Sequence, residues 1–207
     1  QKELQKLKQE VEKDKSLPLR SGATQLVFGE GNPDSDIYFL GEAPGYWEDQ
    51  KGRPFVGQAG KLLDQLIMEL GMKREDVYIS NVVRFRPPEN RDPEPAELEA
   101  FAPYVDREID IINPKVIVTL GRFSMTKFIP DVKISQVHGR PRRMKWNGRD
   151  ITVIPMYHPA AALRSTEVLN ALRDDFKIIS KLLNEDTSTK EMSDESNKDE
   201  IKQMSLI

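Results

Sequence analysis

Four short apolar runs, separated by segments with helical periodicity, constrain the fold of this chain more than any other feature. The runs are residues 37–40, 77–83, 115–121 and 150–157. Strands that alternate with helices form a parallel sheet that helices cover on both faces. The sequence therefore predicts an α/β fold with a central four-stranded parallel sheet. A further short edge strand is expected at residues 26–28.

Each run ends at residues that suit a binding site. The residues at the four exits are Gly41 with Glu42, Asn81, Gly121 and His158. Ligands bind at the carboxyl ends of the strands in open α/β sheets, so we expect these residues to lie together. Each of them alone also fits an ordinary structural role. Their shared location at the strand exits is what favours a site.

The side chains at these exits suit the recognition of a flat heterocycle and its departure as an anion. Asn81 can both donate and accept, so it can read a base edge that carries a carbonyl beside an N–H. His158 can donate a hydrogen bond to oxygen charge that develops on a leaving base. Glu42 could activate water or offset positive charge on a sugar. Phe55, in a loop expected at residues 46–57, could stack on the base.

Basic residues cluster in a predicted hairpin that turns at residues 147–148. The run from Arg140 to Arg149 holds five basic residues, no acid and one tryptophan. It either contacts phosphates or forms a solvated hairpin face. The expected DNA contacts are Arg140, Arg142, Arg143, Arg91 of the proline-rich segment, and Leu163 and Arg164, which follow His158 and could wedge into the base stack.

Composition limits the classes of protein that this chain can be. Its 207 residues, 38% of them hydrophobic, can build one sizeable core, which we place at residues 1–184 with an N-terminal helix at 1–13. Residues 185–207 hold seven acids and three lysines and are expected to be disordered. No apolar run is long enough to span a membrane and no signal peptide is visible, which favours a cytoplasmic protein. The absence of cysteine excludes disulfides and cysteine-bound metals in this chain.

Several motifs together resemble the family 4 uracil-DNA glycosylases. They lie in the family's order between residues 25 and 183, and they are Gly41–Gly45, Gly52–Gly57, Asn81–Val83 with Arg86–Pro93, Val116–Gly121 and Tyr157–Ala161. The resemblance implies a three-layer α/β/α sandwich. It also implies excision of uracil from DNA by hydrolysis of the N-glycosidic bond, without cutting of the strand.

The same resemblance assigns roles to individual residues. Glu42 matches the acid of the catalytic motif, Phe55 the base-stacking aromatic, Asn81 the amide that reads uracil, and His158 the histidine that supports the leaving base. The backbone around Gly41 and Gly45 would complete the pocket. The implied partner is uracil-containing DNA, bound by a monomer.

One departure from the family is large. Its members usually hold an iron-sulfur cluster through four cysteines, and the corresponding positions here are Asp14, Leu17, Phe85 and Phe101. None of these side chains can ligate such a cluster. Since three of them are apolar, a small hydrophobic cluster is expected to tie the proline-rich segment to the body. We expect activity without an iron-sulfur cluster, another cofactor or a metal.

Two other functions remain open at this stage. One is a protein that keeps the pocket and binds DNA or a free base without chemistry. The other is a glycosylase for a different deaminated base, because one amide does not exclude bases with a similar edge. The terminal residues 203–207 also resemble the start of a sliding-clamp-binding peptide, although the closing aromatic pair is missing.

Overall fold

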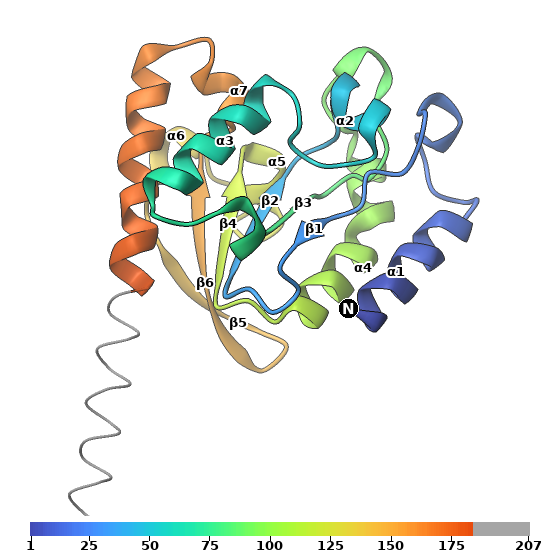
Figure 1. Ribbon diagram of the computed structural model, residues 1–207, viewed down its shortest axis with the longest axis horizontal. Helices are drawn as coiled ribbons and strands as arrows, with labels where there is room; N and C mark the ends of the chain where they lie inside the picture. Colours follow the sequence, from blue (N-terminus) through green and yellow to red (C-terminus); the bar gives the residue numbers. More distant parts are fainter. Residues whose placement is uncertain (184–207) are drawn as a thin grey trace, which may run out of the picture.

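The computed structural model describes residues 1–183 as a six-stranded sheet between two layers of helices (Figure 1). The strand order is β1-β3-β2-β4-β6-β5. The strands are β1 (Glu30–Gly31), β2 (Ile37–Gly41), β3 (Tyr78–Asn81), β4 (Val116–Leu120), β5 (Arg142–Trp146) and β6 (Arg149–Met156).

The four predicted strands form the centre of this sheet. β3, β2, β4 and β6 run parallel, which confirms the predicted parallel core. The sheet has two further strands, β1 and β5, which pair antiparallel at its edges. β5 is the first arm of the predicted hairpin.

The prediction of an edge strand at residues 26–28 is wrong. The edge position belongs to β1, which is too short to leave a period-2 pattern in the sequence. The extended segment around Val27 makes a single backbone bond instead, in which its N–H donates to the carbonyl of Arg84 at 2.9 Å.

Helices cover both faces, as the α/β reading requires. α1 (Lys2–Lys13) and α4 (Pro95–Ile112) pack on one face, while α3 (Gln58–Glu69) and a helix at residues 166–183 pack on the other (Figure 1). The alternation of side chains along β2 explains both layers, because Tyr38 and Leu40 enter the first core while Ile37 and Phe39 enter the second. The shorter helices are α2 (Tyr46–Lys51), α5 (Arg122–Thr126), α6 (Ile134–Val137) and α7 (Pro159–Ala162), with 3₁₀ turns at Arg20–Gly22, Arg74–Asp76 and Pro88–Asn90.

The prediction of a loop at residues 46–57 is partly wrong, because residues 46–51 form α2. Six residues are too few for a helical periodicity to be read with confidence from the sequence. The helix has two acids in its first turn, Glu48 and Asp49, and it ends at Gly52, whose φ is 66°. α2 thereby becomes a wall of the cleft described below.

A buried ion pair fastens the segment after β3 to α4. Nη2 of Arg84 lies 2.6 Å from Oε2 of Glu108, and both side chains are almost fully buried. Glu108 also accepts hydrogen bonds from the hydroxyl groups of Tyr38 and Tyr78. Breaking such a pair leaves an uncompensated buried charge, so this network fixes the segment that leaves the strand of Asn81.

The predicted acidic tail and the clamp-like peptide at residues 203–207 lie outside the described residues, so both stay predictions. Across residues 1–183, no helix is long and apolar enough to cross a membrane.

Candidate active site

A cleft of about 520 Å³ opens at the carboxyl ends of β2 and β3. It brings together residues that stand far apart in the sequence. Of the predicted site residues, those that line it are Glu42, Gly45, Phe55, Asn81, Arg91, His158 and Arg164. The other lining residues are Ala43, Pro44, Glu48, Ala59, Pro87, Asn90, Asp92, Pro93, Ala160 and Ala161.

Asn81 lies on the floor of this cleft, whereas Gly41, a predicted site residue, is buried next to it and does not line the cleft. They are register partners in the neighbouring parallel strands β2 and β3. A Cβ at Gly41 would overlap both the amide oxygen of Asn81 and the ring of Phe55. Oδ1 of Asn81 is buried and has no hydrogen-bond partner among the described residues. Buried polar atoms are nearly always paired, so this oxygen is available to an N–H donor of a ligand.

Glu42 is one of three carboxylates that line the cleft, with Glu48 and Asp92, and its surroundings bring its pKa close to neutrality. Oε1 accepts a hydrogen bond from the backbone N–H of Phe123 at 3.0 Å. Burial raises the pKa of Glu42 to about 7, against the lowering effect of that N–H, and the charge of Asp92 raises it further. Gly121 leaves room for the carboxylate, since a Cβ there would overlap it. Glu42 can therefore exchange protons in the neutral pH range.

His158 is held as a neutral imidazole of defined tautomer. Its Nδ1 accepts a hydrogen bond from the backbone N–H of Ala160 at 3.1 Å and so caps α7. Burial lowers the pKa of His158 to about 4. With Nδ1 acting as an acceptor, the single proton of the neutral ring lies on Nε2. His158 can thus donate one hydrogen bond without carrying a charge.

Phe55 lies against His158, with ring centroids 5.5 Å apart and an interplanar angle of 24°. Its backbone is in the left-handed region with φ of 50°, a costly conformation for an aromatic residue. Two side chains hold this corner. Glu48 accepts hydrogen bonds from the N–H groups of Val56 and Gly57, both at 2.8 Å, and Arg74 donates to the carbonyl of Phe55 at 3.1 Å.

The roles of Glu48 and Arg74 could not be predicted from the sequence. No local pattern signals their contacts, since both reach across at least seven residues of chain. Asn90 and Asp92 of the proline-rich segment also line the cleft without having been singled out. Asn90 accepts a hydrogen bond from Nε of Arg86 at 2.7 Å, and Asp92 pairs with Arg122.

The predicted DNA contacts divide into two groups. Arg91 and Arg164 line the cleft, and Arg91 is paired with Glu97 at 2.6 Å. Leu163 is 53% exposed beside Arg164 but does not line the cleft. Arg140, Arg142 and Arg143 are exposed outside it.

The rest of the basic run serves the hairpin itself. Lys145 pairs with Asp150 across the turn at 2.8 Å. Arg149 donates to the carbonyl of Pro114 at 2.7 Å. Trp146 donates to Asp110 at 2.7 Å. These residues are therefore engaged within the protein, whereas the three arginines before them remain on the surface.

The four positions of the family's cysteines do not fit an iron-sulfur cluster. Leu17, Phe85 and Phe101 are buried, and the rings of the two phenylalanines are 6.1 Å apart, which confirms the expected hydrophobic cluster. Asp14 accepts a hydrogen bond from the hydroxyl of Tyr104 at 2.6 Å. Thiolates are the usual ligands of such clusters, and the chain has none.

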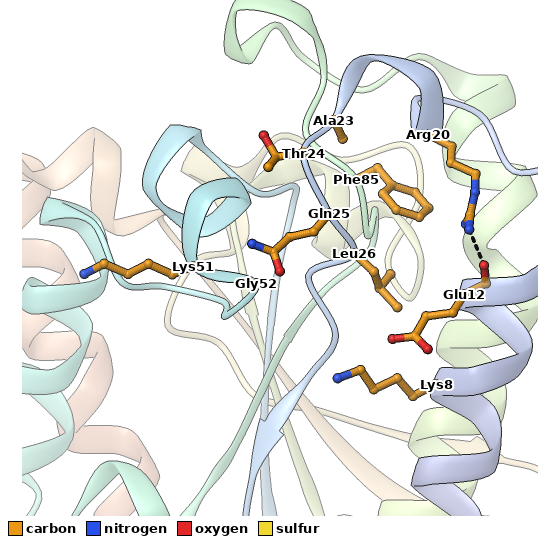
Figure 2. Close-up of a pocket in the computed structure, with 10 residues that line it drawn as sticks. All are labelled: Lys8, Glu12, Arg20, Ala23, Thr24, Gln25, Leu26, Lys51, Gly52 and Phe85. Carbon is orange, nitrogen blue, oxygen red and sulfur yellow. Dashed lines mark hydrogen bonds between the residues drawn. The ribbon is translucent and has the colours of Figure 1, made fainter.

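A second cavity, of about 460 Å³, lies beside this hydrophobic cluster (Figure 2). Phe85 forms part of its wall, and the guanidinium of Arg20 lies 5.3 Å from the centroid of that ring. Arg20 also donates to the carbonyl of Glu12 at the end of α1. The described residues contain no group of three or more His, Cys, Asp or Glu side chains placed to hold a metal ion.

Comparison with known proteins agrees with this geometry. The model of the uracil DNA glycosylase superfamily matches residues 28–181. A type-4 uracil-DNA glycosylase of Sulfurisphaera tokodaii is 50% identical over 186 residues, covering 86% of this chain and 84% of that protein. Those of Archaeoglobus fulgidus and Thermotoga maritima are 43% identical (84% and 89% covered) and 45% identical (81% and 88% covered). This chain therefore belongs to the uracil-DNA glycosylase superfamily and, within it, to the type-4 group.

Proposed function

We propose that this protein removes uracil from DNA by hydrolysing the bond between uracil N1 and C1′ of the deoxyribose, leaving an abasic site. The observation that carries the proposal is Oδ1 of Asn81 on the floor of the cleft, which is buried and finds no hydrogen-bond partner within residues 1–183. Uracil presents an N–H between two carbonyls, which fits that acceptor. The relatives reported above are named for the same activity.

Base recognition would rest on Asn81 and Phe55. Oδ1 of Asn81 would accept from the N3–H of uracil while its amide N–H donates to O4. The ring of Phe55, held by Glu48 and Arg74, would lie against one face of the base. The backbone around Gly41 and Gly45 would complete the pocket, since a Cβ at Gly41 would overlap the Asn81 amide and the Phe55 ring. Because the cleft lies at the surface of the domain, the nucleotide must leave the base stack to reach it.

The chemical step would use His158 and Glu42. As the N1–C1′ bond breaks, the bonding electrons go to uracil, and Nε2–H of His158 donates to the oxygen charge that develops at O2. A neutral histidine suits this role, because it keeps its proton and stabilises the anion by hydrogen bonding. Water adds to C1′ as the sugar becomes cationic, and the carboxylate of Glu42 accepts the proton of that water. Ionised Glu42 also offsets the positive charge on the sugar.

The reaction would proceed without an iron-sulfur cluster. The side chains at the four cysteine positions pack on each other or hydrogen-bond, so they already anchor residues 84–101 to the body of the domain. None of these four side chains lines the cleft. No step above draws on a metal or another cofactor.

The proposal also covers the domain organisation, the oligomeric state and the DNA contacts of the protein. Residues 1–184 act as one domain and as a monomer, inside the cell and with the DNA as partner. Arg140, Arg142, Arg143 and Arg164 contact phosphates, and Leu163 enters the space that the extruded base leaves. Arg91 faces the same cleft, where Glu97 holds its guanidinium in place. The terminal peptide at residues 203–207 would meet a sliding clamp.

A gel assay tests the proposal. A single strand that carries one uracil is incubated with the protein and treated with alkali, which breaks the strand at an abasic site. Breakage is expected with the intact protein and should fall by about a hundredfold or more in Asn81→Ala, because base binding and orientation are both lost. Gly22→Ala is the matched control, since a Cβ there meets no atom within 4 Å. Absence of breakage by the folded protein would contradict the proposal and favour a binding role.

A further inference from the structure

Two large aromatic side chains lie exposed on α2, next to the cleft. Tyr46 is 47% exposed and Trp47 is 56% exposed, and their rings meet edge to face with centroids 5.2 Å apart. Neither is needed for the core. Adjacent exposed aromatics that rim a site are typical of a binding surface.

The acids of α2 are turned away from this surface. Glu48 is held by the N–H groups of Val56 and Gly57. Asp49 is buried and accepts from the N–H of Thr24 at 2.8 Å. The outer face of α2 is therefore left with aromatic and basic side chains, although its sequence contains as many acids as aromatics.

A shallow groove of about 250 Å³ runs beside Trp47. It is lined by Trp47, Lys51, Val56, Gly57, Gln58 and Lys61, so among residues 1–183 two lysines face it and no carboxylate does. Figure 2 shows the side chain of Lys51 extending away from Lys8 and Glu12 of α1. On the other side of the aromatic pair, the guanidinium of Arg86 lies 5.1 Å from the centroid of the Tyr46 ring.

This surface is adjacent to the candidate active site, on the other side of α2. Gly45 and Glu48 line the cleft, whereas Trp47 and Lys51 line the outer groove, so α2 is the wall between them. A helix of six residues is about 9 Å long. A DNA strand that leaves the cleft therefore has only a short distance to cover before it reaches Tyr46 and Trp47.

We propose that the outer face of α2 binds an unpaired nucleotide next to the extruded uracil. Its base stacks on the ring of Trp47, which Tyr46 supports edge to face, and its phosphates contact Lys51 and Lys61. Aromatic faces stack on any base, and lysines track the backbone, which is the usual means of binding single strands without sequence preference. In a duplex the neighbouring bases stack on each other and are not free, so this surface favours single-stranded substrate. The position of the uracil in this proposal rests on the proposed function.

The first test compares single-stranded and duplex substrates. The double variant Tyr46→Ala/Trp47→Ala should raise KM for a uracil-containing single strand about tenfold or more, as expected for a lost stacking contact. KM for the duplex should change by about twofold at most, because the flanking bases of a duplex stack on each other and not on the aromatic side chains of α2. Met68→Ala, which removes a side chain that is 62% exposed on α3, is the matched control. Equal effects on both substrates, or none, would overturn the proposal.

A second test does not depend on excision. The chain has two tryptophans, so in a Trp146→Phe background the fluorescence reports on Trp47 alone. A single strand without uracil should quench this fluorescence saturably. When binding is followed by a label on the DNA, Trp47→Phe should keep most of the affinity that Trp47→Ala loses. If Tyr46→Ala/Trp47→Ala binds this DNA strand as tightly as the wild type does, the proposal is wrong, even if the fluorescence of Trp47 is quenched. A protein that binds through Trp47 but fails to excise would contradict only the proposed function.

Discussion

Gly41 and Asn81 are register partners on neighbouring parallel strands, and a Cβ built on Gly41 would lie only 2.3 Å from Oδ1 of Asn81. The position of the Asn81 amide, which lines the cleft, thus depends on the absence of a side chain at residue 41. A Cβ at Gly41 would enter the space of both the Asn81 amide and the Phe55 ring.

Gly41→Ala should therefore reduce excision strongly while the fold persists. The added methyl has to displace Asn81 or Phe55, and overpacking of this kind costs about 1–3 kcal/mol of stability. A displacement of the base-reading amide should lower kcat/KM by about a hundredfold. Kinetics and thermal unfolding measured beside the control Gly22→Ala would check this, and a fully active Gly41→Ala would contradict the assignment of the cleft floor.

The activity should rise with pH through neutrality, because Glu42 acts as a carboxylate and burial raises its pKa to about 7. The pH profile of kcat/KM reports groups of the free enzyme, so its acid limb should have a midpoint close to that value. Glu42→Gln should be much slower and should lose this limb. An unchanged limb in the variant would assign the titration to another group.

The same carboxyl should affect stability in the opposite direction. Since the pKa of Glu42 in the folded protein is raised from 4.5 to about 7, its contribution to stability is present below pH 4.5 and is lost as the pH rises to about 7. Glu42→Gln should therefore be more stable than the wild type at alkaline pH, by about 3 kcal/mol at most, and by less in acid. Urea unfolding at both pH values measures the difference.

Two substitutions of His158 separate its two contacts. His158→Asn keeps a side-chain acceptor for the N–H of Ala160 but loses the Nε2–H donor, whereas His158→Ala loses both. Both should slow the chemical step by about a hundredfold or more, as is found when a donor to a developing anion is removed. Only His158→Ala should also lose about 1 kcal/mol of stability through the missing helix cap. Single-turnover rates and unfolding curves distinguish the two effects.

The hydrophobic cluster at the former cysteine positions should be essential for stability and independent of iron. Phe101 is fully buried, so Phe101→Ala should cost about 3–5 kcal/mol, far more than truncation of the exposed Leu163. Treatment with an iron chelator should leave the unfolding temperature and the rate unchanged. A lower unfolding temperature after chelation would contradict the proposal that no cluster is held.

The three surface arginines of the basic run should set much of the salt dependence of DNA binding. Replacement of Arg140, Arg142 and Arg143 by Gln should lower the slope of log K against log salt by about 2–3 for duplex DNA, since each phosphate contact contributes about 0.9. A triple Gln variant of Lys2, Lys6 and Lys13, which are exposed on α1, carries the same change of charge and should alter the slope less. Equal slopes for the two variants would remove the basic run from the interface.

The strands and the long helices could be predicted because their signals are local. Ile37 to Leu40 are four consecutive apolar residues between turn residues, and the spacing of Leu4, Leu7 and Val11 predicted the buried face of α1. β1 and α2 escaped prediction because elements of two and six residues are too short to show a period. Neither could be placed without its partners in the folded chain.

The sequence by itself determined which residues stand at the strand exits, and motif resemblance gave Glu42, Asn81, Phe55 and His158 their expected roles. Only the tertiary structure decided the pKa values and the backbone conformation of those residues. The pKa of Glu42 and the pKa of His158 depend on burial, and the left-handed corner at Phe55 depends on Glu48. The inward turn of the acids of α2, which leaves Trp47 on a basic surface, depends on N–H groups from other segments. Burial and long-range hydrogen bonds arise only once distant segments pack together, so no local pattern records them.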